Sequence, residues 1–229
     1  IKPFDFYIKK GEVNGFTGLL GSGRSECVRA MFSADKVIAG TMKKNGKAVK
    51  ITKPLDAMKN GIAYLPEDRK NDGIVGDLSV RDNIILAAQV LRGFFRPFSR
   101  AEANKFADEY IKLLEIKTAS ADTPIKSLSG GNQQKVVIAK WLYSNADVYI
   151  FDEPTRGIDV GARDEIYNIM YDLVNQGASI IMISSDLVEV LKMCDRVAVM
   201  REGVLEAILD NSPDLTQETI LKYAMQGGI

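Results

Sequence analysis

A glycine-rich run near the start of the chain has the composition of a phosphate-binding loop. Residues 18–25 read GLLGSGRS, which matches the glycine spacing of such a loop but has Arg24 where a lysine is expected. Glycines are required because the backbone N–H groups must curl around phosphate oxygens without clashes from Cβ atoms. A helix that begins near Ser25 would direct its positive end at the anion. The alternatives are a glycine-rich turn without a ligand and a dinucleotide site, although the spacing here is GxxGxG rather than GxGxxG.

Two runs in the second half of the chain add to this chemistry. Residues 147–153 read DVYIFDE, an apolar strand that ends in Asp152 and Glu153. In nucleotide hydrolysis the first acid would help to hold Mg²⁺ and the second would activate the attacking water, although this run alone is also typical of a solvated acidic turn. Residues 128–134 read LSGGNQQ, and small residues at a helix start offer free N–H groups to a second anion. The three runs together favour a nucleotide site.

The elements that must position these residues alternate along the chain. Short apolar runs without helical spacing predict buried strands, and these runs are 62–65, 148–151, 179–183 and 197–200. Helical patterns separate the last three of them, so the sequence predicts an α/β fold with a mostly parallel core sheet. Residues 201–203 predict a hairpin turn, which gives the sheet a small antiparallel part.

Three helix starts are marked by a capping side chain and a carboxylate three residues later. These pairs are Ser79 with Asp82, Ser99 with Glu102, and Asp186 with Glu189. Apolar stripes with helical spacing follow the first two, and no strand pattern occurs between 77 and 128. We therefore expect 77–128 to be an inserted helical subdomain, with 1–76 and 129–229 forming the core of a single domain.

Composition excludes several classes of function. The 229 residues carry 30 Lys+Arg and 30 Asp+Glu, so the neutral chain lacks the positive charge typical of a nucleic-acid binder. The histidine count of 0 excludes a Ser-His-Asp or Cys-His nucleophile and any metal site that needs imidazole. Cys27 and Cys194 are far apart and predict reduced core thiols, as in a cytosolic protein. No apolar run approaches the roughly 18–20 residues of a spanning helix, so a role at a membrane requires a partner protein.

The motifs together resemble the nucleotide-binding domain of an ATP-binding cassette (ABC) protein, across essentially the whole chain. LSGGNQQ followed by DEPTRGID at 152–159 carries this resemblance. GLLGSGRSE at 18–26, PEDRKNDG at 66–73 and ISSD at 183–186 are similar, more narrowly, to the second cassette of tandem ATPase subunits in simple-sugar importers of the ribose, galactoside and xylose type. The resemblance implies the P-loop NTPase fold of an ABC ATPase, ATP and Mg²⁺ as cofactors, and ATPase activity coupled to sugar transport.

The resemblance also implies a role for each motif residue. Nucleotide phosphates would be bound by the glycine-rich loop and the start of the helix after it, at Gly18, Gly21, Ser22, Gly23, Arg24, Ser25 and Glu26. Mg²⁺ would be held by Ser25, Asp152 and Glu67, and Glu153 would be the catalytic base. The signature would close over nucleotide bound to a partner cassette, and it consists of Leu128, Ser129, Gly130, Gly131, Asn132 and Gln133. Asp159 would lie along the seam between the two cassettes.

Three departures from the family pattern face the same end of the nucleotide. Arg24 replaces a lysine, Glu67 replaces the glutamine that reaches Mg²⁺ and the γ-phosphate region, and Ser185 replaces the histidine that contacts the γ-phosphate. Glu67 adds negative charge beside a polyanion, although it could still ligate a metal. We therefore expect an asymmetric cassette, which hydrolyses ATP slowly or not at all at its own site and whose signature serves the partner's site.

The resemblance further implies partners outside this chain. They are a second cassette, membrane permease subunits and, indirectly, a periplasmic or extracellular sugar-binding protein, and nucleic acid is not among them. The chain would then lie peripherally at the cytoplasmic face of the cell membrane. It begins with Ile1 rather than Met, which favours the C-terminal piece of a longer tandem protein. Two alternatives stay open, a non-hydrolytic regulatory or assembly cassette and a soluble ABC ATPase without a permease.

Overall fold

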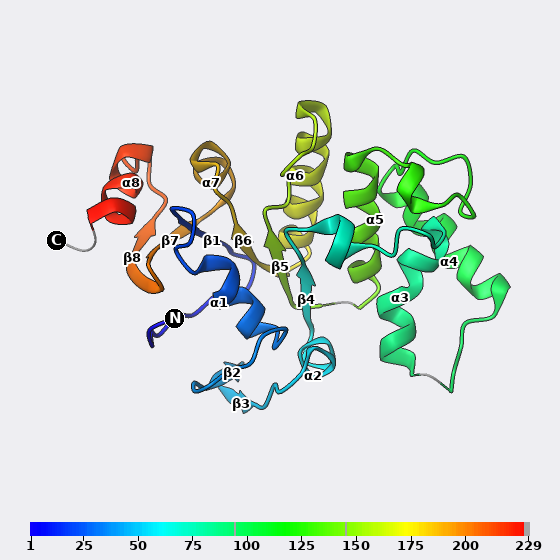
Figure 1. Ribbon diagram of the computed structural model, residues 1–229, viewed down its shortest axis with the longest axis horizontal. Coiled ribbons are helices and arrows are strands. Elements are labelled where there is room, and N and C mark those ends of the chain that lie inside the picture. The colour runs from blue at the N-terminus through cyan, green and yellow to red at the C-terminus, as the bar shows by residue number, and fades with distance from the viewer. Residues whose placement is uncertain (94, 145, 227–229) are drawn as a thin grey trace.

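A mostly parallel sheet organises the protein. The computed structural model describes residues 1–93, 95–144 and 146–226, and within them six strands pair in the order β4-β5-β6-β1-β7-β8 (Figure 1). The strands that pair in parallel are β1 (Val13–Gly18), β4 (Ile62–Leu65), β5 (Val148–Asp152), β6 (Ser179–Ile183) and β7 (Arg196–Arg201). The edge strand β8 (Val204–Asp210) is antiparallel to β7, and β2 (Met42–Lys44) forms a separate antiparallel pair with β3 (Lys47–Val49). The predicted α/β class, with its mostly parallel sheet and small antiparallel part, is confirmed.

The four predicted strands are present because each is a continuous apolar run, as a sheet buried on both faces requires. All residues of β4 and β6 are buried. The predicted hairpin turn joins β7 to β8, and its residues Glu202 and Gly203 have φ angles of 48° and 77°. Two successive left-handed residues match the right-handed twist of the flanking strands, and glycine adopts this conformation without a Cβ clash.

Among the parallel strands, the central strand β1 is the one that the apolar pattern does not single out. Asn14 and Gly15 interrupt its apolar residues, yet Asn14 is only 1% exposed. A Cβ atom on Gly15 would lie 2.6 Å from Sγ of Cys194, so glycine allows the chain after α7 (Leu187–Met193) to approach the strand closely. Cys194 and Cys27 are both free and buried, as predicted.

The predicted helix starts are also present. Oγ of Ser79 accepts a hydrogen bond from N of Asp82, and Ser99 forms a reciprocal capping box with Glu102. Oδ1 of Asp186 accepts from N of Glu189, at 3.3 Å. The longer helices are α3 (Val80–Arg92), α4 (Arg100–Leu113), α5 (Gly130–Leu142), α6 (Val160–Asn175) and α8 (Gln217–Gln226). The shorter helical elements are α1 (Arg24–Met31), α2 (Pro54–Lys59), η1 (Arg69–Gly73) and η2 (Ile125–Ser127).

The helices divide into two groups in space. In Figure 1 α3, α4 and α5 lie together at one end of the molecule, and β8 and α8 lie at the opposite end. No strand lies between 77 and 128 within the described residues, and α3 packs against both α4 and α5. The division into a core and a helical subdomain stays a prediction.

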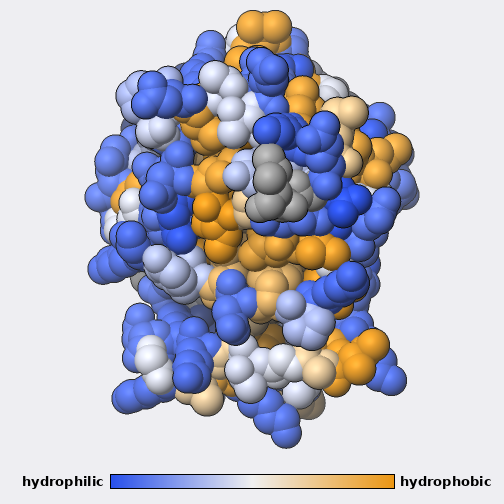
Figure 2. Space-filling model, turned by 90° about the vertical axis from the view of Figure 1, so that its left-hand side faces the viewer, coloured by the Kyte–Doolittle hydropathy of each residue, from blue (hydrophilic) through white to orange (hydrophobic). Residues whose placement is uncertain are grey.

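The end that carries β8 and α8 exposes apolar surface. Figure 2 shows hydrophobic side chains gathered near the middle of this face, with hydrophilic residues around them. Partly exposed residues of these two elements include Ile208, Leu221 and Met225.

Among the described residues, no helix combines the length and apolar character needed to cross a membrane.

Candidate functional site

The carboxyl ends of β1, β5 and β6 lie side by side, because these strands are neighbours and parallel. The glycine-rich run begins at the end of β1. Asp152 is the last residue of β5 and Glu153 comes directly after it, while Ser184 and Ser185 come directly after β6. Residues separated by more than 100 positions along the chain therefore meet at one edge of the sheet. The sequence predicts which motifs are present, and the parallel pairing places them together.

The glycine-rich run forms a tight turn into α1. A Cβ atom on Gly18 would clash with the carbonyl oxygen of Met200 and lie 2.8 Å from Oγ of Ser22, so only glycine fits there. Gly23, the N-cap of α1, is left-handed with φ 94°. Oγ of Ser22 is buried and has no hydrogen-bond partner among the described residues. A buried hydroxyl without a partner at a helix start fits a site that is completed by an anion.

Arg24 turns back onto the site instead of extending into solvent. Its Nη1 donates to the carbonyl oxygen of Gly18, and its Nη2 forms an ion pair with Oε1 of Glu153 at 3.1 Å. The two side chains are only 12% and 7% exposed. The cation at the lysine position of the loop is therefore bonded to the carboxylate predicted to be the catalytic base.

Glu153 is held on both carboxylate oxygens. Oγ of Ser185 donates to its Oε2 at 3.1 Å, and the backbone N of Glu153 donates to the carbonyl oxygen of Ile183 at 2.9 Å. Burial raises the pKa of Glu153, and the Ser185 hydroxyl and the Arg24 cation act in the opposite direction. Glu153 also has φ 48°, a left-handed backbone that is uncommon for a residue other than glycine. Two of the three departures from the family pattern thus converge on Glu153.

Asp152 lies beside this pair and beside α1. Oγ of Ser25 donates to its Oδ1 at 3.2 Å, and the hydroxyl of Tyr64 donates to its Oδ2 at 3.1 Å. Burial raises the pKa of Asp152 to about 6, the neighbouring charge of Glu153 raises it as well, and both hydroxyls act to lower it. A serine hydroxyl next to a poorly solvated carboxylate is an oxygen donor set that Mg²⁺ accepts, so these two residues fit the predicted metal. Tyr64 was not predicted, because only the pairing of β4 with β5 brings it to Asp152.

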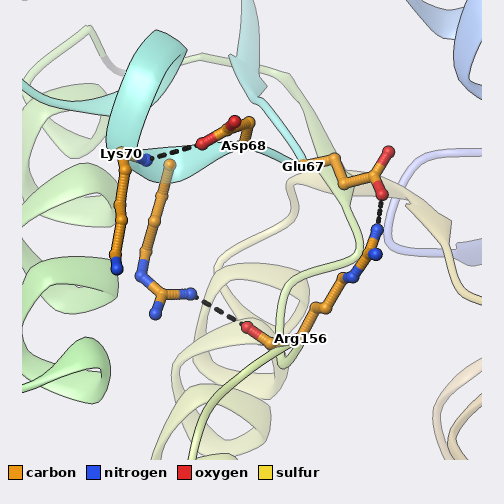
Figure 3. Close-up of a pocket in the computed structure, with 5 residues that line it drawn as sticks. Glu67, Asp68, Lys70 and Arg156 are labelled. Carbon is orange, nitrogen blue, oxygen red and sulfur yellow. Dashed lines mark hydrogen bonds and ion pairs between the residues drawn. The ribbon is translucent and has the colours of Figure 1, made fainter.

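Glu67 has a different neighbour. Its Oε1 forms an ion pair with Arg156, which lies after β5 (Figure 3). Both residues line a cavity of about 300 Å³ together with Asp68, Arg69 and Lys70. A metal role for Glu67 requires this ion pair to open, and it stays a prediction.

The signature forms the start of α5. Ser129 is its N-cap, and Nδ2 of Asn132 donates to Oγ of Ser129 at 2.9 Å. Oδ1 of Asn132 accepts from N of Lys117 at 2.7 Å, and Nε2 of Gln133 donates to the carbonyl oxygen of Leu128 at 3.2 Å. These contacts tie the first turn of α5 to the residues that precede it.

The signature packs on the start of α6 and lies away from the phosphate loop. A Cβ atom on Gly131 would lie 2.7 Å from Cβ of Ala162, and Oδ1 of Asp159 caps α6 by accepting from N of Ala162 at 3.0 Å. In Figure 1 α5 lies with the helices at one end, whereas α1 lies on the other side of β4 and β5. The predicted site residues other than Glu67 therefore form two groups, one around Arg24, Ser25 and Glu153 and one around the signature and Asp159.

Comparison with known proteins identifies the family. The family model described as ABC transporter matches residues 1–156. The chain belongs to the ABC transporter family. Its fold is accordingly the P-loop fold of an ABC ATPase, and ABC ATPase domains bind ATP.

Similar ABC proteins include sugar importers. The chain is 47% identical over 222 residues to the fructose import ATP-binding protein FruK of Bifidobacterium longum, covering 97% of this chain and 43% of that protein. It is 46% identical over 226 residues to the ribose import ATP-binding protein RbsA of Lactococcus lactis subsp. cremoris, covering 99% of this chain and 46% of that protein. The chain therefore spans less than half the length of these curated relatives.

Solved ABC structures share the fold. The structure of cbiO1 from Clostridium perfringens, part of the ABC transporter complex cbiONQ, has a TM-score of 0.74 and 26% identity, covering 92% of this chain and 82% of that chain. The ATP-binding cassette MJ0796, dimeric in a post-hydrolysis state with ADP and Pi, has a TM-score of 0.76 and 22% identity, covering 90% of this chain and 88% of that chain. The second likeness supports the fold alone.

Proposed function

We propose that this chain is the ATP-binding module of an ABC importer for simple sugars, and that it is the second cassette of a tandem protein. The named relatives that are 46–47% identical are fructose and ribose import ATP-binding proteins, and each is more than twice as long as its match to this chain. That length leaves room for a second cassette. The module would bind permease subunits at the cytoplasmic face of the membrane and act indirectly with a sugar-binding protein.

One observation supports an asymmetric site in particular, the ion pair between Arg24 and Glu153. A general base must be free to accept a proton from water, and this carboxylate is bonded by Arg24 on one oxygen and by Ser185 on the other. A guanidinium that is bonded to Gly18 and Glu153 is also not free to neutralise charge on a leaving phosphoryl group. We therefore infer slow or absent hydrolysis at this site, with the signature completing the partner cassette's site.

The residues of the phosphate loop would bind the nucleotide through their backbone. N–H groups of residues 21–26 at the start of α1 would bind the phosphates, and the partnerless hydroxyl of Ser22 would donate to one of them. Ser25 and Asp152 would hold Mg²⁺, which supplies positive charge to the phosphate oxygens when it is bound. Tyr64 would fix the orientation of the Asp152 carboxylate.

The test compares two variants of the full-length protein that carries this chain. Gly130→Ala places a Cβ atom 2.6 Å from Nη2 of Arg69 and 3.3 Å from the carbonyl oxygen of Gly157, so it displaces the groups packed on the signature. Glu153→Gln removes the candidate base. We expect Gly130→Ala to lower ATP turnover at least tenfold and Glu153→Gln to lower it less than twofold. Asp172→Asn, on the exposed face of α6, serves as the control. The opposite order of the two effects would contradict the asymmetric assignment.

The same ion pair also favours a second candidate, a regulatory cassette that binds nucleotide and clamps its partner without any hydrolysis in the assembly. Calorimetric titration with Mg-ATP, together with a turnover assay on the full-length protein, separates the two functions. Binding at sub-millimolar affinity without turnover would favour the regulatory cassette. Binding with turnover that depends on Gly130 would favour the importer ATPase.

A further inference from the structure

Arg69 connects two loops that lie far apart in the sequence. It is the first residue of η1, the short helical turn that follows β4, and its side chain reaches the segment after β5. Its Nη1 donates to the carbonyl oxygen of Arg156 at 2.9 Å, and its Nη2 donates to the carbonyl oxygen of Gly157 at 3.4 Å. A planar guanidinium can bond two neighbouring carbonyl groups at once, which a single ammonium group does less well.

The same guanidinium lies against the signature. A Cβ atom on Gly130 would be 2.6 Å from Nη2 of Arg69 and 3.3 Å from the carbonyl oxygen of Gly157. A side chain at position 130 would therefore displace the Arg69 guanidinium and press on the carbonyl oxygen of Gly157. The Arg69 side chain therefore connects η1, to which it belongs, with residues 156–157 and with the first residue of α5.

A second contact fixes η1 to the same helix. Nζ of Lys140, a buried side chain near the end of α5, donates to the carbonyl oxygen of Gly73 at 2.6 Å. Lys140 and Gly130 are separated by about 15 Å along the helix, at 1.5 Å per residue. Residues of η1 therefore contact α5 near both ends of that helix, and Arg69 links residues 156–157 to the same pair of elements.

The charge of Arg69 is not matched by an ion pair within the described part of the chain. Its acceptors there are backbone carbonyls, and its buried Nε has no hydrogen-bond partner. Burial lowers the pKa of Arg69. Because the planar guanidinium bonds two successive carbonyl oxygens, it fixes the position of residues 156–157 relative to η1.

We propose that Arg69 is a positioning residue that holds residues 156–157 against Gly130, and so sets the relative position of the signature and of the segment that leads to Asp159. This proposal rests on the proposed function, in which the signature and Asp159 both face the partner cassette. Loss of Arg69 would then impair the site that the signature completes and leave this chain's own phosphate loop unchanged.

The test measures local backbone protection as well as activity. In the full-length protein, Arg69→Gln is compared with Arg69→Lys and with Arg100→Gln, which removes an exposed arginine on α4 that pairs with Asp122. We expect Arg69→Gln to speed hydrogen–deuterium exchange at least fivefold in residues 129–133 and 155–160, with less than twofold change in residues 18–26. Arg69→Lys should give an intermediate change, and Arg100→Gln none.

Turnover gives the second readout. We expect Arg69→Gln to lower kcat at least tenfold, with KM for ATP changed less than twofold, because the phosphate loop is not touched. Unchanged exchange at residues 129–133 and 155–160, or equally faster exchange throughout the chain, would overturn the proposal. If the wild-type protein binds and hydrolyses no ATP, the proposed function fails, and the exchange pattern still decides the role of Arg69.

Discussion

Replacing Asp152 by asparagine should stabilise the folded chain and at the same time weaken its binding of Mg²⁺. The Asp152 carboxyl has its pKa raised to about 6, from an ordinary value of 3.8, chiefly because burial penalises its charge. The unfolded chain therefore ionises this group more readily than the folded chain does. The free energy of unfolding of the wild type therefore falls as the pH rises from about 4 to about 6. Above that range the full cost of burying the ionised carboxylate is present.

The magnitude follows from the two pKa values. At about 1.4 kcal/mol for each pH unit, the ionised carboxylate costs about 3 kcal/mol at pH 7.5, about half of that at pH 5 and less than about 1 kcal/mol at pH 4. Asparagine is neutral, and it can still accept from Tyr64 through Oδ1 and donate to Oγ of Ser25. For a chain of this size, about 3 kcal/mol corresponds to a rise in Tm of roughly 6–12 °C.

The assay is thermal unfolding without nucleotide or divalent cation, at pH 7.5, 5 and 4. Asp152→Asn is compared with the wild type and with Asp172→Asn, an exposed surface change expected to stay within about 0.5 kcal/mol. The stabilisation by Asp152→Asn should be largest at pH 7.5 and shrink towards pH 4. A Tm at pH 7.5 that is equal to or below that of the wild type would refute the reasoning, as would a gain that does not change with pH.

Two further changes test the phosphate loop. Arg24→Lys should tighten Mg-ATP binding at least threefold in calorimetry, because the compact ammonium can lie between phosphates and no longer pairs with Glu153; unchanged affinity would show that this pair does not limit binding. Gly18→Ala should lower the free energy of unfolding by about 3 kcal/mol or more in urea denaturation, because its Cβ atom would clash with the carbonyl oxygen of Met200. Gly21→Ala is the matched comparison, since none of the described residues lies within 4 Å of its Cβ position, and it should cost about 1 kcal/mol through its φ of 77° alone. Equal losses for the two glycine variants would contradict the clash.

Local patterns were sufficient for much of the fold. Strands β4 and β6 are visible in the sequence because both of their faces are buried, so nearly every residue is apolar. The capping pair Ser99 and Glu102 marks the start of α4 because capping involves residues that are neighbours in the chain. Strand β1 has no such signal, since the need for Gly15 comes from Cys194, more than 150 positions away in the chain.

The sequence by itself determined the class of chemistry. Glycine spacing, an acidic strand end and the signature are local patterns, because a phosphate loop and a helix start are each built from consecutive residues. Only the tertiary structure decided what the charged side chains do. Arg24 bonds Glu153, Tyr64 orients Asp152, and Arg69 reaches residues 156–157. Long side chains can turn towards several partners, and the partner is selected by the order and register of parallel strands, which no local pattern specifies.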